Sequence, residues 1–585
     1  MNTRLISDLN KINPKFEGYK LSPFNKGLHR TDLIQENIQV HKDANDHRMG
    51  FRDLQARIRH SHLIYGFPLD HTRGSAFCID QDFNLFMIVY NKITKQTKFH
   101  SITELIKPLP VPAFTEPSDI VPIEPQLPSV IALSTELVLA SNGVGDIELI
   151  GLEEKDGAML GTSLASVCYL GTGKEGITPV PCVLLTARQV KDKIIMVVYS
   201  HTATKKTEFN IATLEMNIPT PETERLSDGS FVLMLKTLHI QQGAEVPVYC
   251  AITPSGKRCI LGSETKYVKE GYEEVADENK MQVDDPYKWN QDGSDITIVF
   301  ELPSETPKSS INCKFLVDHL SLLVKSGDEL LVSYPYRKLW STIRPDECLW
   351  TFESGLLTLF ITKMDENTRW PQLFDHDDGV LENLSQDALS EIKSKLERLT
   401  ASEGAMTSTS QPAQHPASTD MDEEIDESGQ PIIFTVYDTE GTIVDEFHSG
   451  TYNWICKSYD KTKRLPSICL QMDVDGLVFS FTETVDHRIE IKHEATFDAF
   501  AFVQASKRDG RFTLHDPNFN FTSIIESSRN AYIYFHHDDK RKIEVQTLID
   551  LTQGNDVDVI GAQLLLDDTL MILTETQVIV IELIE

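Results

Sequence analysis

The 585-residue sequence has no uninterrupted apolar run of about 18 residues, the length that a membrane-spanning helix needs. Its first residues, MNTRLISDLNKINPKFEG, also lack the continuous apolar core of a secretory signal. We therefore expect no signal peptide and no membrane insertion, and a location in the cytosol or nucleus.

Basic residues are also scarce: 55 Lys and Arg stand against 88 Asp and Glu, which leaves a formal net charge of -33. Much of the acidic excess lies in two runs, EGYEEVADENKMQVDD and DMDEEIDES. A chain with this charge repels a phosphate backbone, so we expect no direct nucleic-acid partner.

The nine cysteines never form a Cys-x-x-Cys pair. Most stand in apolar, strand-like contexts such as ASVCYL and SICLQM, which is typical of buried, reduced thiols. We therefore expect neither a disulfide framework nor a structural zinc site.

What the sequence has in abundance is short β-branched and aromatic runs broken by Gly, Asp, Asn and Pro, the pattern of β-strands. Several stretches predict hairpins with a very apolar first strand and a more alternating second strand. They are LFMIVYNKITKQTKFHSI, ELVLASNGVGDIELIGL, IIMVVYSHTATKKTEFNIATL, GLVFSFTETVDHRIEIKH, AYIYFHHDDKRKIEVQTL and TLMILTETQVIVIELI. This asymmetry suits inner and outer strands of one sheet, as in the blades of a divergent β-propeller.

The hairpins lie on both sides of a different central block, and each side alone is too short for a complete ring. At about 40–45 residues a blade, the two sides together suffice for seven or eight blades. We therefore predict an all-β chain in which residues 1–268 and residues 431–585 share one β-propeller of about seven blades. Neither a Trp-Asp dipeptide nor a kelch signature is present, so an array of β-sandwiches is the alternative.

Three further segments differ in character from the propeller halves. Residues 269–285 are acidic, and residues 401–430 are rich in Ser, Thr and Pro and then acidic, so both are predicted to be linkers. Within residues 376–400, LSQDALSEIKSKLERL places apolar residues on one helical stripe behind Ser385 as N-cap. We expect one short amphipathic helix there. Its stripe consists of Leu389, Ile392, Leu396 and Leu399.

The central block, residues 286–375, contains short strands in quick succession: DITIVFEL, INCKFLVD, HLSLLVK, ELLVSYP, ECLWTFE and LLTLFITKM. Alternation without a helix predicts a small antiparallel β-sandwich. The aromatic spacing resembles the CS domain of the NudC family. The block has Tyr-x-Trp-x-Gln at its start, Leu-Trp before an Ile-x-x-x-Glu run, a Trp on the next strand and an Arg-Trp close.

The flanks of this block look like corresponding stretches of longer, NudC domain-containing members of that family, in the same order. They are KFEGYKLS, VPVYCAITPSGKRCILGS, MDVDGLVFS and FVQASKRDGRF. The resemblance implies a non-enzymatic, cytoplasmic and nuclear co-chaperone. Its implied partners are the ninety-kilodalton heat-shock chaperone and clients that contain β-propellers. One departure is Pro371 in RWPQLF, which replaces an aromatic common in the family, so a groove of paired aromatics is in doubt.

Three short motifs resemble parts of enzyme or metal sites, but the residues around them do not fit such sites. LGTGKEG has the glycine spacing of a nucleotide loop, but a proline-containing strand follows it rather than a helix. DVDG at 473–476 lacks the further acidic ligands of a calcium loop, and HHDD at 536–539 fits a hairpin tip. Neither Gly-x-Ser-x-Gly nor His-Glu-x-x-His is present. We therefore predict no catalytic residue, metal or cofactor.

Candidate binding residues gather in the central block, which holds four of the five tryptophans. Trp350 alternates with Leu349 and Phe352 on a strand, which predicts a core position, whereas Trp289 and Trp370 stand at the ends, where an exposed edge or groove is expected. The candidate protein-binding set is Tyr287, Trp289, Gln291, Lys314, Arg337, Lys338, Trp340, Arg369 and Trp370. Its cations form either a solvated face or a patch that orients an acidic client.

Three functions are open at this point. The first is a co-chaperone or adaptor that binds a chaperone or client through the CS domain, with the propeller as a second surface. The second is a scaffold subunit or adaptor of a large RNA-helicase or transport-coat complex, in which the CS domain is a spacer. The third is a propeller enzyme with a site assembled from distant loops.

Overall fold

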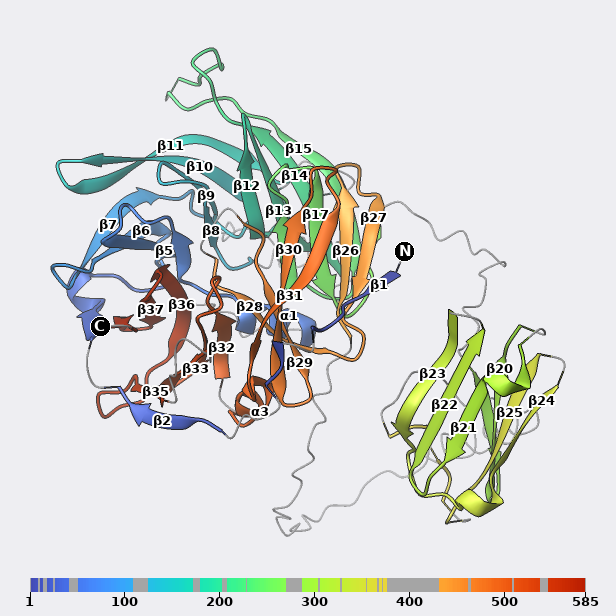
Figure 1. The fold of residues 1–585 in the computed structure, drawn as a ribbon. Coiled ribbons are helices and arrows are strands. Elements are labelled where there is room, and N and C mark those ends of the chain that lie inside the picture. Colours follow the sequence, from blue (N-terminus) through green and yellow to red (C-terminus); the bar gives the residue numbers. More distant parts are fainter. Residues whose placement is uncertain are drawn as a thin grey trace, which may run out of the picture. The chain divides into compact units, whose positions relative to one another are not determined.

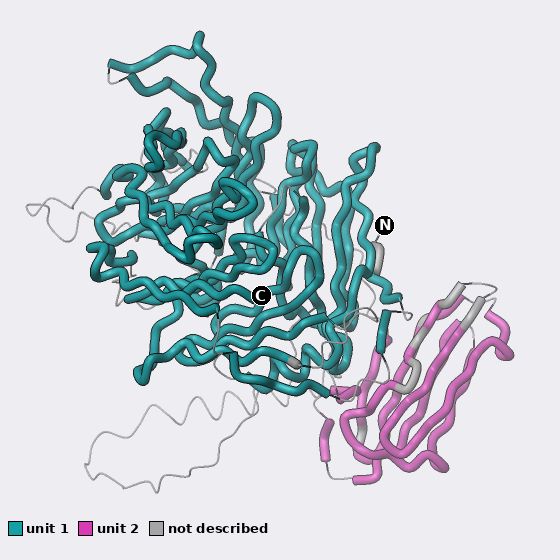
Figure 2. Tube along the Cα trace, turned by 60° about the vertical axis from the view of Figure 1, so that its left-hand side comes forward, with its two compact units in different colours: residues 1–272, 424–585 teal, residues 273–423 magenta. Residues whose placement is uncertain are grey.

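The computed structural model forms two compact units, residues 1–272 with 424–585 and residues 273–423 (Figure 2). The predicted helix of residues 376–400, the predicted linker 401–430 and residues 270–285 of the other predicted linker lie outside the residues that the structure describes, whereas Lys269 belongs to a strand. The described residues are 2–8, 11–13, 18–24, 27–41, 51–108, 125–171, 179–202, 208–227, 229–269, 287–303, 306–326, 329–353, 355–365, 368–370, 372–375, 431–460, 464–507, 510–536 and 545–583.

The described part of the first unit contains seven antiparallel, four-stranded meanders, here called sheets 1 to 7 (Figure 1). Sheet 1 comprises β4 (Ile64–Gly66), β5 (Arg73–Ile79), β6 (Asn84–Asn91) and β7 (Gln96–Glu104). Sheet 2 comprises β8 (Ser129–Ala132), β9 (Leu137–Ser141), β10 (Asp146–Lys155) and β11 (Ala158–Cys168). Sheet 3 comprises β12 (Val183–Val190), β13 (Lys193–His201), β14 (Phe209–Asn217) and β15 (Leu235–Gly243), with the short β18 (Val268–Lys269) added at its edge.

Sheet 4 is assembled from both sides of the central block. Its first two strands, β16 (Tyr249–Ile252) and β17 (Arg258–Ser263), precede the block, and β26 (Ile433–Asp438) and β27 (Ile443–His448) follow it. Strands β17 and β26 pair along six residues, with Ile260 opposite Val436. The central block is therefore inserted between the second and third strands of one sheet.

The remaining sheets come from the C-terminal region. Sheet 5 comprises β28 (Asn453–Ser458), β29 (Ile468–Met472), β30 (Asp475–Glu483) and β31 (Ile489–Phe497). Sheet 6 comprises β32 (Gly510–His515), β33 (Phe521–Glu526), β34 (Asn530–Phe535) and β35 (Val545–Asp550), and β28 pairs with β32 at one end. Sheet 7 comprises β36 (Val559–Leu566), β37 (Thr569–Thr574), β38 (Gln577–Glu582) and, from the N-terminal region, β3 (Leu28–Asp32).

Clusters of buried apolar residues join each sheet to the next, and another joins sheet 7 to sheet 1. One member from each cluster, taken in that order, gives Val138, Met196, Leu261, Leu470, Tyr534, Ile533 and Met571. Sheets that bury both faces against their neighbours in this order are the blades of a β-propeller. The prediction of an all-β chain with about seven blades shared by the N- and C-terminal regions is confirmed.

The predicted hairpins are confirmed as well, and their asymmetry has the expected cause. The middle strand β13, KIIMVVYSH, is buried along nearly its whole length, because blades pack against both of its faces. The outer strand β7, QTKFHSITE, has mostly exposed and half-buried positions, and its one buried side chain is Ile102.

The N-terminal segment runs along the blades that follow the central block. Strand β1 (Asn2–Arg4) pairs in parallel with β27 of sheet 4, and β2 (Lys20–Pro23) pairs in parallel with β35 of sheet 6. Between them, Lys11 donates to the carbonyls of His493 and Glu494 in sheet 5, at 2.6 and 3.1 Å. The described residues up to Asp32 therefore contact sheets 4 to 7 in turn, and no local sequence pattern predicts these contacts.

Two short helices were not predicted from the sequence. Helix α1 (Phe51–Arg59) has Asp53 in its first turn and Arg57 and Arg59 in its last, which suits the helix dipole. Helix α3 (Phe500–Ala505) follows Ala499, whose backbone N–H donates to Asp475 Oδ1 at 2.6 Å. Single 3₁₀ turns occur at η2 (Ile34–Glu36), η3 (Lys308–Ser310) and η4 (Pro345–Glu347). None of the described helices has the length and hydropathy to cross a membrane.

The second unit is a two-sheet β-sandwich, as predicted. One sheet has the order β19 (Lys288–Asp292), β20 (Asp295–Glu301), β25 (Leu356–Thr362), β24 (Leu349–Glu353). The other has the order β21 (Ile311–Phe315), β22 (His319–Ser326), β23 (Glu329–Lys338). Alternate residues of both sheets, such as Ile298, Leu322 and Leu359, enclose one core.

Candidate functional site

The aromatic residues expected at the ends of the sandwich lie in its core. Trp289 is 1% and Trp370 2% exposed, and Tyr287 is equally buried. The expectation of an exposed edge for the two tryptophans is therefore wrong. Strand β19 alternates, so Tyr287 and Trp289 face the interior, while Lys288 and Asn290 face outward.

Gln291 ties the beginning of the sandwich to its end. Its Oε1 accepts the backbone N–H of Trp370 at 2.9 Å, and its Nε2 donates to the Trp370 carbonyl at 2.7 Å. The same Oε1 accepts from the buried ammonium of Lys363 at 2.7 Å, which also donates to the carbonyls of Gly293 and Thr368. A buried amide or ammonium is costly unless it is hydrogen-bonded, and these bonds satisfy both groups. Gln291 therefore has a structural role.

The other two tryptophans are partly buried against the same core. The Trp340 ring lies 5.9 Å from the Trp370 ring, at an angle of 52°. Trp350 packs against the core from β24, which agrees with the position predicted for it. The aromatic spacing of the block is thus explained by packing, since rings of this size dominate the core of a small sandwich.

Arg337 covers an aromatic cluster at the edge of the core. Its guanidinium lies 5.1 Å from the centre of the Phe374 ring, which stacks on Tyr334 at 5.5 Å. A cation above a ring face is attracted by the ring quadrupole. The half-buried Arg337 therefore contributes to folding as well as to surface charge.

The remaining predicted cations are exposed. Lys314 on β21 makes no ion pair or hydrogen bond with any residue that the structure describes. Lys338 on β23 donates to Asp375 at 3.1 Å across an exposed ion pair, and Arg369 is exposed next to the buried Trp370. Lys314 is thus accessible to an acidic partner, whereas the charge of Lys338 is partly balanced.

An exposed apolar surface lies on the outer face of the four-stranded sheet and was not predicted. Leu349 of β24 is 53% exposed and stands directly opposite Phe360 of β25, which is 39% exposed. Leu356 continues the same face, and Val299 of the neighbouring strand is half-buried there. We call Leu349, Leu356 and Phe360 the apolar face. A signal was present in LLTLFIT, where apolar residues occupy both alternations of a single strand.

Reactive groups are not prominent in the sandwich. Burial raises the pKa of the Cys313 thiol to about 12, so this cysteine stays protonated and is a poor nucleophile. Within the described part of the chain, no three His, Cys, Asp or Glu side chains gather as metal ligands would.

Three motifs resemble parts of enzyme or metal sites but have the wrong neighbouring residues. One of them forms a turn, and the other two lie partly outside the described residues. DVDG forms the tight turn between β29 and β30, where Met472 pairs with Asp475 and Asp473 takes a left-handed φ of 54°. Residues 172–176 of LGTGKEG and 537–539 of HHDD lie outside the described residues.

Comparison with known proteins agrees with this architecture. Residues 285–363 match the CS domain family. Over 560 residues the chain is 26% identical to NudC domain-containing protein 1 of Mus musculus, covering 89% of this chain and 87% of that protein. The protein of the same name from Xenopus tropicalis is 23% identical over 557 residues, with coverage of 89% and 87%.

The solution structure of the CS domain of human KIAA1068 protein is 16% identical, covers 17% of this chain and 80% of that chain, and has a TM-score of 0.15.

Proposed function

Because this chain belongs to the NudC family and carries its CS domain, we propose that it is a non-enzymatic co-chaperone or adaptor that binds other proteins. The CS domain is the proposed contact, and the propeller presents a second surface. The proposal extends to the ninety-kilodalton heat-shock chaperone and propeller-containing clients as partners, and to a cytoplasmic and nuclear location. The observation that carries it is the apolar face on the outer side of the sandwich.

An exposed pair of large apolar side chains on a sheet face needs an explanation, because outward positions of such strands are usually polar. Leu349 and Phe360 are direct cross-strand neighbours, so they form one continuous surface. Covering a Leu or Phe side chain contributes about 1.5–3 kcal/mol. Two such residues are therefore strong candidates for the centre of a protein interface.

The exposed cations supply the second component. Lys314 lies on the other sheet, away from the apolar face, in a chain whose net charge is -33. A local positive group in an acidic protein steers acidic segments toward it while the rest of the surface repels them. We assign Lys314 to orientation of an acidic client segment, and the apolar face to affinity.

The test uses the full chain with purified ninety-kilodalton chaperone and with cell lysate. The double substitution Leu349→Ser with Phe360→Ser is expected to reduce binding at least about tenfold, through the lost apolar burial. Val317→Ser is the matched control, because Val317 is similarly exposed on the same unit. Lys314→Glu tests the cationic component against Lys308→Glu, another exposed lysine. Unchanged binding in all of these variants would contradict the assignment of surfaces.

The scaffold function remains the second candidate, and one feature of the propeller favours it. The connection from β14 to β15 exposes apolar side chains, with Met234 85% exposed and Leu226 and Val232 also accessible. Deletion of residues 287–375 separates the two candidates. Loss of the captured partners supports the co-chaperone, and full retention of them supports a scaffold that binds through the propeller.

A further inference from the structure

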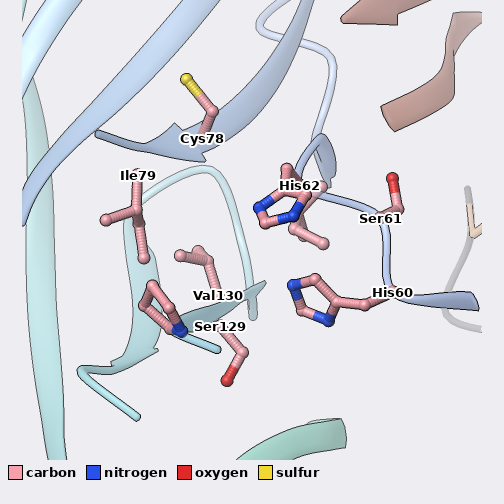
Figure 3. A pocket seen from close by; sticks show the side chains of 9 residues that line it. His60, Ser61, His62, Cys78, Ile79, Ser129 and Val130 are labelled. Atoms are coloured by element: carbon pink, nitrogen blue, oxygen red, sulfur yellow. The ribbon is translucent and has the colours of Figure 1, made fainter. Parts of the chain in front are cut away.

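The cavity beside helix α1 is too small to accept a group from a partner. Figure 3 shows the rings of His60 and His62 at its wall, together with Ser129 and Val130. The enclosed space between these side chains holds little more than a water molecule. A partner therefore fits the surface of the molecule better than this cavity.

The sandwich has four edge strands, β19 and β24 in one sheet and β21 and β23 in the other. An edge strand presents backbone N–H and C=O groups that can pair with another chain. Proteins usually block such an edge with Lys, Pro, a bulge or a covering segment. The four edges of the sandwich differ in this protection.

Three of the edges are protected. Strand β19 carries the exposed Lys288, and β21 carries the exposed Lys314. Strand β23 contains Pro335, and its pairing with β22 shifts register twice. At the end of β23, Leu339 also forms a bridge with Phe374, which covers that part of the edge.

Strand β24 has none of these devices. Its five residues, LWTFE at Leu349–Glu353, include neither Lys nor Pro, and they pair with β25 without a register shift. Among the described segments, β25 alone exchanges hydrogen bonds with this strand, which ends its sheet (Figure 1). Alternate residues of an antiparallel edge strand turn their N–H and C=O groups outward, so β24 has such groups available for pairing.

The side chains of β24 indicate which kind of strand fits this edge. Leu349, Thr351 and Glu353 are exposed on the outer face, whereas the half-buried Trp350 faces the interior. Glu353 makes no ion pair or hydrogen bond with any residue in the described ranges. An added strand therefore meets a leucine at one end, a free carboxylate at the other and an incompletely covered indole between them.

A second copy of this chain does not fit the edge. Antiparallel self-pairing centred on Thr351 would place Leu349 opposite Glu353, so that each apolar side chain meets a carboxylate. A segment with a cation opposite Glu353 and an apolar residue opposite Leu349 is complementary at both positions. The charge and the apolar residue of the edge thus favour a different protein as partner.

Building on the proposed function, on which this inference rests, we propose that β24 binds an extended segment of another protein as a fifth, antiparallel strand. Backbone hydrogen bonds supply affinity in this mode, and the register of the side chains supplies specificity. The segment has Lys or Arg opposite Glu353 and, four residues later, a Leu-like residue opposite Leu349. The residue opposite Trp350 is apolar and completes the cover of the indole. The added strand extends the apolar face.

The experiment uses the full chain and the labelled peptide Gly-Lys-Val-Thr-Val-Leu-Gly, which has the required order. Fluorescence anisotropy should show saturable binding, and hydrogen exchange followed by mass spectrometry should show slower exchange in β24 and not in β21. The same peptide N-methylated at every residue lacks backbone donors and should not bind. Equal binding of both peptides, or no saturable binding up to about 1 mM, overturns the proposal.

Variants test the register. Glu353→Lys is expected to weaken binding about fivefold, and a peptide with Glu in place of its Lys should regain the loss on this variant. Asp318→Lys makes the same charge change beside the other sheet and is the control. Leu349→Ser should weaken binding about tenfold, whereas Val317→Ser, at an equally exposed position, should not. Equal losses in the edge and control variants contradict the register.

This outcome is distinguishable from failure of the proposed function. Suppose that Leu349→Ser with Phe360→Ser abolishes binding of the purified chaperone, while the peptide does not bind the unchanged chain. The edge pairing is then wrong and the proposed function stands. A dimer of the full chain that Leu349→Ser dissociates would assign the edge to a second copy, which also overturns the proposal.

Discussion

The propeller and the sandwich differ in what they bury. Buried side-chain polar atoms without a hydrogen-bond partner, such as those of His41, His239 and Tyr437, occur in the described part of the propeller. The described part of the sandwich has none, and even its buried ammonium, Lys363, is satisfied. The sandwich instead places apolar and cationic side chains outside. The buried polar groups of the described sandwich are thus hydrogen-bonded, whereas the described part of the propeller keeps several unsatisfied polar atoms inside.

The largest expected effect on the stability of one unit alone is that of removing a core tryptophan of the sandwich. Trp289→Ala is expected to destabilise the sandwich by about 3–5 kcal/mol, because a cavity replaces a buried indole. The propeller transition should not move, since its buried clusters share no residue with the sandwich core. Calorimetry on the full chain resolves the two transitions, and Leu349→Ala is the exposed control. A single transition that shifts as a whole would contradict the separation.

Acid should act on the propeller and spare the sandwich. Desolvation lowers the pKa of the fully buried His515 to about 4, so the fold requires the neutral imidazole. An unfolded histidine titrates near pH 6.5. The stability from His515 is therefore complete above pH 6.5 and lost as pH falls toward 4, by about 3 kcal/mol in all. His239, also lowered to about 4, acts in the same direction.

Denaturant unfolding between pH 7.5 and 4.5 checks this difference. The sandwich has His319 as its histidine within the described residues, and that side chain is partly exposed. Its transition should change little over the range in which the propeller weakens. Equal acid sensitivity of the two transitions would show that buried histidines do not set the difference.

The N-terminal segment offers a smaller test within the propeller. Leu5 is 4% exposed between sheets 4 and 5, whereas its neighbour Ile6 is 81% exposed. Leu5→Ala is expected to cost about 2 kcal/mol of propeller stability, and Ile6→Ala should be near neutral. Urea unfolding of the two variants compares burial at adjacent positions. Equal effects would mean that the segment does not hold these blades.

The smallest effect is expected at the sandwich surface. Lys338→Ala removes the exposed ion pair with Asp375 and should change the free energy of unfolding by less than about 1 kcal/mol. Urea unfolding of this variant, with Lys308→Ala as a control, measures it. A loss of several kcal/mol would show that this charge serves folding rather than recognition.

Much of the fold could be predicted from the sequence because the spacing of apolar residues determines where its strands lie. The hairpins, the sandwich strands and the sharing of one propeller by two distant regions follow from apolar first strands such as LFMIVY and from blade length. Helix α1 and strands β1 and β2 did not follow. The two strands are short and polar, and tertiary pairing with β27 and β35 determines them rather than local pattern.

The candidate site was predicted less well. Spacing identified Trp289, Gln291 and Trp370 as important, but spacing alone does not distinguish a core ring from a surface ring at the end of a domain. The register of β24 and β25 places Leu349 beside Phe360, and register depends on the folded sheet.

The account depends most on one claim, that the N- and C-terminal regions share a single propeller. Cleavage of the full chain at a specific protease site introduced within residues 401–430 tests it directly. Strand pairs β17–β26 and β3–β38 join the two fragments, so they should elute together in native size-exclusion chromatography and separate only in denaturant. Separation of the two fragments in native buffer would contradict the claim.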